Sequence, residues 1–213
     1  MTKLMLHACC GPCSLEPTRI FSEEGTEFII DYENPNIFPP EEYEHRLSTL
    51  KEYVTEPQKV ELIEGEYDPQ TWEEQVAIYG TDRPKRCRAC YRLRLERAAE
   101  HAVEHGCDSL TTTLTISPYQ FTDIIFEELQ RAADRYGIKA ICCDFRSCYP
   151  EATRRSRALG MYRQNYCGCR FSIAEAAAER KERKKQLEHE KYLKHRALMW
   201  AAAEGCTNQM SQL

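Results

Sequence analysis

Short, mostly apolar segments alternate with amphipathic segments along most of the chain, and this alternation restricts the possible folds more than any other feature. Five segments read as strands: KLMLHA, TEFIID, KVELIE, DSLTTTLT and IKAICCDF. The segments between them show helical periodicity, as in residues 41–55, where Tyr43, Leu47, Leu50 and Val54 share one face. Apolar strands joined by helices form a parallel sheet that helices cover on both faces. We therefore predict a three-layer α/β domain with a parallel sheet.

The sequence after about Ser172 differs from the rest of the chain. It contains the segment AEAAAERKERKKQLEHEKYLKHRALMWAAAEG, which combines high helix propensity with mixed charge. We predict one α/β domain over residues 1–172 and a C-terminal helical extension over residues 173–213. A solvated extension is favoured, and a helix that faces RNA or forms an oligomer is the alternative.

The cysteine content indicates the kind of chemistry. The chain has 213 residues, 12 cysteines and a formal net charge of −5. No apolar run reaches the roughly 20 residues that span a bilayer, and the first residues lack the anatomy of a signal peptide. We expect a cytoplasmic protein without a membrane partner. In that compartment so many cysteines indicate metal or redox chemistry rather than disulfides.

The ends of the predicted strands show where a functional site would lie. In parallel α/β folds, ligands bind beyond the carboxyl ends of the strands. Residues 7–13 follow the first predicted strand, residues 113–117 follow the fourth, and Asp144 ends the fifth. Asp144 is a candidate general acid or metal ligand, and a cap of the next segment is the alternative.

The segment HACCGPCS contains Cys10-Gly11-Pro12-Cys13, which has the spacing of a thioredoxin active site. A thioredoxin places this motif at a helix start, where the pKa of one thiol is lowered. Here only one short strand precedes the motif, and Cys9 replaces the usual tryptophan. A thioredoxin-like thiol oxidoreductase that uses Cys10 and Cys13 remains an alternative.

A second C-x-x-C pair, Cys87 and Cys90, lies at the head of a predicted helix. Together with Cys9 and Cys10 it offers four thiolates, which suit either tetrahedral zinc or a [4Fe–4S] cluster. Adjacent cysteines are unusual in a structural zinc site and favour the cluster. The alternative is a non-catalytic, zinc-binding RNA-binding protein.

The third group is the C-x-C motif of Cys167 and Cys169, with Gly168 between them. It is either a second metal-binding pair or a redox-active dithiol. Cys13 is left open as a supporting residue. The remaining cysteines are interpreted as ordinary core or loop residues: Cys107, Cys142, Cys143, Cys148 and Cys206.

Basic residues gather around two of these cysteine groups, although the chain is acidic overall. Arg83, Lys85, Arg86, Arg88, Arg92, Arg94 and Arg97 surround one, and Arg154, Arg155, Arg157, Arg163 and Arg170 surround the other. A local basic face can bind a polyanion even when the total charge is negative. The alternative is a solvated basic face of a helix.

Seven segments together resemble one known family. In order they are LHACCGPCS, NPNIFPPEEY, EYDPQTW, RCRACYRLRL, TTTLTISP, CDF and MYRQNYCGC. They span about residues 4–172 and are similar to epoxyqueuosine reductases of the QueH type. The resemblance implies a flavodoxin-like α/β fold related to the nucleotide-hydrolase and pyrophosphatase superfamily. It also implies the last step of queuosine synthesis, in which epoxyqueuosine at the anticodon wobble position of tRNA is reduced to queuosine without cobalamin.

The resemblance further implies a cofactor, partners and residue roles. Four residues match the ligands of a [4Fe–4S] cluster: Cys9, Cys10, Cys87 and Cys90. Cys167 and Cys169 match a redox-active pair. We expect Asp144, or an additional iron ion held by Asp144 and thiolates, to act on the epoxide oxygen. The partners are tRNA that carries epoxyqueuosine and an external electron donor.

Three positions depart from residues common in that family. Glu33 stands where an aromatic or small residue is frequent, and Arg146 and Cys148 stand where lysines are frequent. None of the three belongs to a cysteine group with an implied role.

Overall fold

The structure is a computed structural model that describes the backbone of residues 3–210 and the side chains of residues 3–196. The chain divides into two compact units, Met1–Arg170 and Phe171–Leu213. The strands are β1 (Lys3–His7), β2 (Glu27–Tyr32), β3 (Leu62–Glu64), β4 (Ser109–Thr112) and β5 (Lys139–Ala140). The helices are α1 (Gly11–Glu23), α2 (Pro40–Leu50), α3 (Glu56–Gln58), α4 (Pro69–Gln75), α5 (Arg83–Glu104), α6 (Thr122–Tyr136), α7 (Tyr149–Ala158) and α8 (Arg170–Met210).

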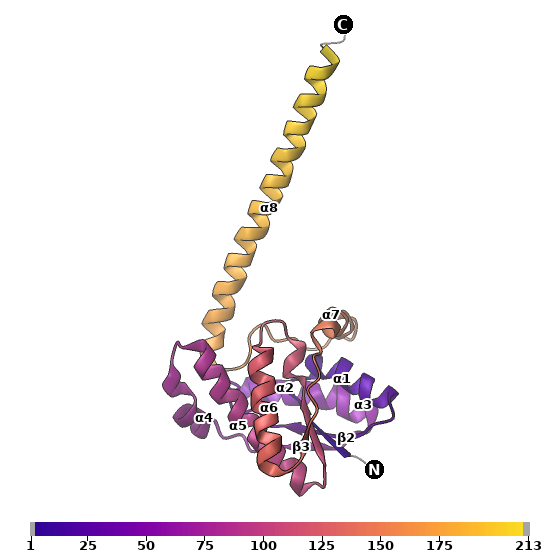
Figure 1. Cartoon of the computed structure of the whole chain (residues 1–213), viewed down its shortest axis with the longest axis vertical. Helices are drawn as coiled ribbons and strands as arrows, with labels where there is room; N and C mark the ends of the chain where they lie inside the picture. The colour runs from indigo at the N-terminus through magenta and orange to yellow at the C-terminus, as the bar shows by residue number, and fades with distance from the viewer. Residues whose placement is uncertain (1–2, 211–213) are drawn as a thin grey trace. The chain divides into compact units, whose positions relative to one another are not determined.

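The five strands form one parallel sheet in the order β3-β2-β1-β4-β5. Figure 1 labels β2 and β3 of this sheet. Its central strand is β1, whose last residue His7 pairs with Asp31 of β2 and Thr112 of β4. The predicted three-layer α/β fold with a parallel sheet is confirmed. The strand order is that of dinucleotide-binding folds, whereas flavodoxins themselves have the order 2-1-3-4-5.

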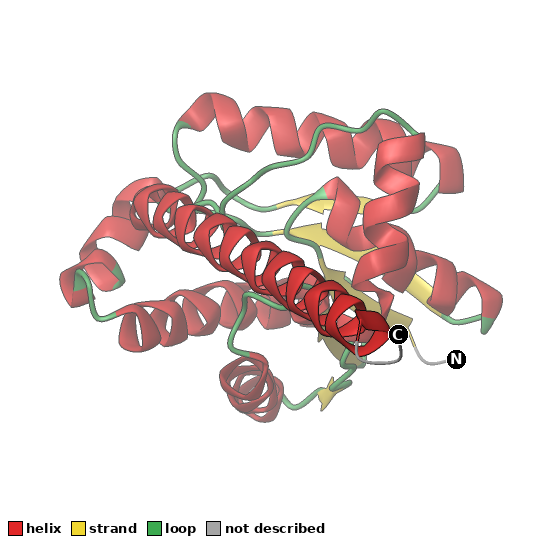
Figure 2. Cartoon of the chain, turned by 90° about the horizontal axis from the view of Figure 1, so that it is seen from above, coloured by secondary structure: helices red, strands yellow, loops and turns green. Residues whose placement is uncertain are grey.

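Helices pack on both faces of the sheet, as Figure 2 shows. Leu4 and Leu6 of β1 belong to a buried cluster with α1, α2 and α7, and Met5 belongs to a second cluster with α5 and α6. This division follows from the alternation of side chains along a strand. Because both faces are covered, the strands are apolar without regular alternation, which is the pattern that identified them.

Several predicted boundaries differ in the structure. The fifth strand is only two residues long, so Cys142 and Cys143 follow it in an irregular segment, and Cys142 is exposed. The interpretation of Cys142 as a buried strand residue was wrong. Ser117 and Pro118 are typical of a helix start and predict a helix from Ser117, but the helix begins at Thr122, because residues 117–120 form a turn instead. The helix predicted from Cys87 begins at Arg83, where the side chain of Asp82 accepts a hydrogen bond from the Lys85 amide.

The second unit contains nearly all of α8. Every residue from 177 to 196 is exposed. Within the described part of the chain, no helix has the length and apolar character needed to cross a membrane.

Candidate functional site

The site begins where β1 ends. β2 and β3 extend the sheet on one side of β1, whereas β4 and β5 extend it on the other side. Ligands in such folds bind where the order changes direction, here between β1 and β4. Cys9 and Cys10 follow β1 directly, and Cys10 is the N-terminal capping residue of α1. The Cys9 amide donates to Thr113 Oγ1 at 3.1 Å, and the Thr113 hydroxyl donates to Cys9 Sγ at 3.4 Å. Cys9 is therefore anchored across the gap between two adjacent strands.

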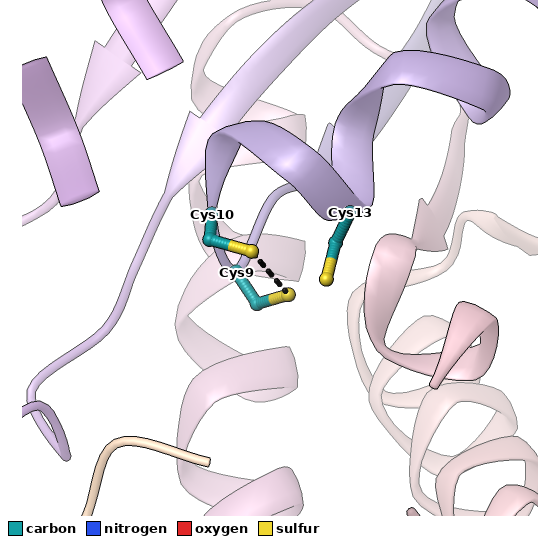
Figure 3. Close-up of side chains that lie close together, drawn as sticks. All are labelled: Cys9, Cys10 and Cys13. Carbon is teal, nitrogen blue, oxygen red and sulfur yellow. Dashed lines mark hydrogen bonds between the residues drawn. The ribbon is translucent and has the colours of Figure 1, made fainter. Parts of the chain in front are cut away.

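Three sulfur atoms meet at this point (Figure 3). The Sγ atoms of Cys9, Cys10 and Cys13 all lie within 4.8 Å of one another, and those of Cys9 and Cys10 are 3.9 Å apart. Cys13 reaches the group because it stands in the first turn of α1. Its role was left open by the sequence, and the structure joins it to the other two thiols.

The three thiols differ in their tendency to ionise. Hydrogen bonds from the Cys10 and Cys13 thiols hold the pKa of Cys9 well below its ordinary value. Burial raises the pKa of Cys10 to about 12, and hydrogen bonding to Cys10 and Cys9 raises that of Cys13. One thiolate with two thiols beside it is a set of soft donors that suits iron or zinc, and metal binding would release the remaining protons.

Cys87 and Cys90 are the fifth and eighth residues of α5. Their spacing of three residues places both on one face of the helix. Cys90 is buried, and the indole Nε1 of Trp72 donates to its Sγ at 3.3 Å. Trp72 is the buried residue of α4, so this short helix serves to place a neutral donor against a site sulfur. Burial raises the pKa of both Cys87 and Cys90.

The loop with Cys167 and Cys169 contacts the first cysteine group. Gln164 Nε2 donates to Cys10 Sγ at 2.7 Å, and Gln120 Nε2 donates to Cys167 Sγ at 3.4 Å. Burial raises the pKa of Cys167 to about 11. This loop and the end of β1 are far apart in the sequence, and the tertiary structure brings them together.

Two buried arginines connect the cysteine groups electrostatically. Arg94 of α5 interacts with Cys90, Cys167 and Cys9. Arg46 of α2 interacts with Cys10 and Cys167. Both guanidinium groups are almost fully buried, so each lies in a medium where its charge acts strongly on a thiolate.

Arg46 also holds the C-x-C loop in place. Its Nη1 donates to the Cys167 carbonyl at 2.8 Å, its Nη2 donates to the Tyr166 carbonyl at 3.4 Å, and its Nε pairs with Glu42 at 2.7 Å. The sequence analysis did not identify Arg46, because an arginine after a histidine in a helix belongs to no recognisable functional motif. Glu42, one turn earlier on the same helix, was the available signal, because its spacing from Arg46 predicts an ion pair.

Gly168 allows this loop to approach the segment that precedes α2 closely. Its φ is +144°, a conformation that favours glycine, and a Cβ at this position would lie 2.8 Å from Asn36 Nδ2. The Phe38 amide donates to the Gly168 carbonyl at 3.0 Å. The glycine between the two cysteines therefore fixes where both sulfurs lie.

We expect Arg46→Met to destabilise the protein by about 3 kcal/mol, because it leaves Glu42 without its partner in a buried ion pair. Urea unfolding followed by circular dichroism measures the change. Arg154→Met is the matched control, since Arg154 pairs with Glu151 on the surface and such pairs contribute about 1 kcal/mol or less. Equal effects of the two substitutions would contradict the clamping role of Arg46.

Asp144 is placed differently from the cysteines. It follows β5, its side chain is 40% exposed, and it forms a two-pronged ion pair with Arg146. Hydrogen bonds from Arg146 lower the pKa of this carboxyl. An ionised carboxylate is a poor proton donor at neutral pH, so of the two roles expected for Asp144 only metal ligation suits its charge state.

Comparison with known proteins gives the class of this site. The family model described as "Epoxyqueuosine reductase QueH" matches residues 4–175. The chain belongs to the QueH family. A QueH epoxyqueuosine reductase of Thermotoga maritima is 36% identical over 182 residues, which cover 82% of this chain and 92% of the relative. The Haemophilus influenzae enzyme is 33% identical, over 86% of this chain and 77% of the relative. The Staphylococcus epidermidis enzyme is 31% identical, over 84% of this chain and 80% of the relative.

Membership of this family makes the chain an oxidoreductase. The expected family resemblance is confirmed, and the QueH match favours it over the thioredoxin-like and zinc-binding alternatives. The matched region contains all three cysteine groups and ends within the first turns of α8.

Proposed function

We propose that this QueH enzyme reduces epoxyqueuosine to queuosine in tRNA, in the cytosol, with electrons from an external donor. The observation that carries the proposal is the convergence of three separate cysteine groups at the carboxyl end of β1, in a chain of the QueH family. The reaction opens a three-membered ring: the epoxide takes up two electrons and two protons, and yields an alkene and water.

The residues present suit a [4Fe–4S] cluster. Cys9, Cys10, Cys87 and Cys90 would supply its four thiolates. Three of these sulfurs already accept a hydrogen bond, from Thr113, Gln164 and Trp72, and the buried Arg94 offsets negative charge beside them. Hydrogen bonds to sulfur and nearby charge are what set the potential of such clusters. When bound, the cluster would transfer single electrons.

Cys167 and Cys169 are proposed as the pair that holds two electrons. Oxidation of two thiols to a disulfide releases two electrons and two protons, which equals the requirement of the reaction. Cys169 is buried and Cys167 is half-buried, so the pair is shielded from bulk solvent. The external donor would then reduce the disulfide back to the dithiol.

An additional iron ion is part of the same proposal. Cys13 is not needed among the four proposed cluster ligands, yet its sulfur lies within the group of Cys9 and Cys10. Cys13 is the thiol proposed for such an ion, and Asp144, whose carboxylate pairs with Arg146 in the structure, is the carboxylate proposed beside it. The ion would polarise the epoxide oxygen as a Lewis acid.

The test is anaerobic purification followed by iron and sulfide analysis and a nucleoside assay. We expect more iron than sulfide, because the additional ion brings iron without sulfide. We also expect absorption near about 400 nm and conversion of epoxyqueuosine in tRNA to queuosine, detected by mass spectrometry. Zinc in place of iron, or an iron-loaded protein that leaves epoxyqueuosine unchanged, would contradict the proposal.

A further inference from the structure

The arginines that flank the cysteines are mostly committed to other contacts. Arg88 and Arg92 pair with Glu128, Arg97 pairs with Glu33 and Asp68, Arg154 pairs with Glu151, Arg155 pairs with Glu16, and Arg170 pairs with Glu73. Arg86 and Arg94 are 1% exposed. A face whose cations are buried or neutralised by carboxylates attracts a polyanion weakly. The basic segments around the site are therefore not the strongest candidates for contact with RNA.

A different part of the chain carries an excess of basic over acidic residues. Residues 179–196 of α8 contain eight lysines and arginines against four glutamates, although the whole chain has a net charge of −5. All of these residues are exposed. The segment lies beyond residue 175, where the QueH family model ends.

The cations of α8 are not spread evenly around the helix. Five of them recur at helical spacing and form what we name the cationic stripe: Arg180, Arg183, Lys184, Lys191 and Lys194. At about 100° per residue they fall within an arc of about 100°, and none of the four glutamates lies in that arc. The stripe extends for about 21 Å along the helix axis.

This arrangement is unfavourable for an isolated helix. Lys191 and Lys194 are three residues apart, so two like charges are neighbours on the helix surface. Lys184 and Glu188 form an ion pair at 3.9 Å between two exposed side chains, and such a pair contributes little to stability. A polyanion bound along the stripe would remove the repulsion.

We propose that the cationic stripe of α8 binds the phosphate backbone of tRNA. This inference rests on the proposed function only in taking tRNA as the polyanion. Phosphates are the complementary charge, and a row of cations on one helix face matches a row of phosphates along a strand. The stripe acts independently of sequence, so it contributes affinity rather than choice of tRNA.

Two other partners suit the stripe less well. A coiled coil with a second copy needs apolar residues at heptad spacing, yet Arg180, Leu187 and Lys194 alternate charge with a single leucine. A membrane surface needs one apolar face, whereas Leu187, Tyr192 and Leu193 point in three directions around the helix.

The test compares two triple variants of the full chain that change the net charge equally. Lys184→Gln, Lys191→Gln and Lys194→Gln neutralise the stripe, and Lys181→Gln, Lys185→Gln and Arg196→Gln neutralise cations on the opposite side. Glutamine has nearly the helix propensity of lysine and arginine, and circular dichroism verifies that α8 persists. Binding of a tRNA transcript is measured by fluorescence anisotropy at several salt concentrations.

We expect the stripe variant to lower the slope of log affinity against log salt by about 2, since each lost phosphate contact removes about 0.7–0.9. This corresponds to a loss of affinity of roughly a hundred-fold at about 0.1 M salt. The opposite-side variant should leave the slope unchanged. Equal effects of both variants, or unchanged binding by the stripe variant, would overturn the inference.

Three additional measurements distinguish the outcomes. A stripe variant that loses binding only to phosphatidylglycerol vesicles, or only self-association in sedimentation velocity, would overturn the assignment to tRNA. A protein that binds tRNA through the stripe yet does not reduce epoxyqueuosine would support this inference and contradict the proposed function. A protein that reduces epoxyqueuosine but binds tRNA equally well without the stripe would support the proposed function and contradict this inference.

Discussion

Replacing Cys90 by alanine is expected to remove the bound iron and the reductase activity together. Cys90 is 7% exposed, and its sulfur accepts a hydrogen bond from Trp72 and interacts with Arg94. A buried position without solvent access offers no replacement ligand, so loss of one thiolate leaves the proposed cluster with three. Cys9→Ala, Cys10→Ala and Cys87→Ala should give the same result, because each residue would supply a quarter of the coordination shell of the proposed cluster.

The measurement is iron and sulfide content, with the nucleoside assay, on proteins prepared anaerobically. Cys107→Ala is the matched control, because Cys107 is also buried but packs among the apolar residues of α5 and α6. It should retain both iron and activity, at a modest cost in stability of about 1 kcal/mol. A Cys90→Ala protein that keeps its full iron content would show that α5 supplies no ligand.

Replacing Cys169 by serine is expected to leave the iron largely in place and to abolish the conversion of epoxyqueuosine to queuosine. Serine keeps the size of the side chain but cannot form a disulfide, so the pair can no longer hold two electrons. Cys167→Ser should behave identically, since both sulfurs are needed for one disulfide. The readouts are the iron content, the absorption spectrum and the nucleoside assay.

Cys142→Ser is the control for this pair, because Cys142 is exposed, lies after β5 and has no role in the proposed reaction. It should retain both iron and turnover. If Cys169→Ser loses its iron as completely as Cys90→Ala, then the C-x-C motif is a ligand pair. If it keeps both iron and full turnover, the dithiol takes no part in the reaction.

The sequence was sufficient to identify the fold class and the position of the site. Apolar runs such as KLMLHA are buried on both faces, so their pattern reflects the parallel sheet directly. The carboxyl ends of parallel strands share one edge, which is why residues 9–13 and 113 could be expected together. The family also follows from sequence alone, because its motifs are contiguous segments. Strand and helix boundaries were predicted less accurately, as β5 and the start of α6 show. Ser117 and Pro118 are typical of a helix start but form a turn instead.

Other features depended on contacts between residues distant in the chain. Arg46 and Cys167 are 121 residues apart, and Gln164 and Cys10 are 154 apart, so no local pattern joins them. The membership of Cys13 in the thiol group depends on how the first turn of α1 points its side chain. From the sequence, the arginines of residues 83–97 and 154–170 were expected to be able to contact RNA. Only the tertiary structure shows carboxylates paired with many of them. Residue types and local periodicity determine which chemistry is possible. Long-range packing decides which side chains are buried, ion-paired or accessible, because burial and pairing depend on the neighbours that folding supplies.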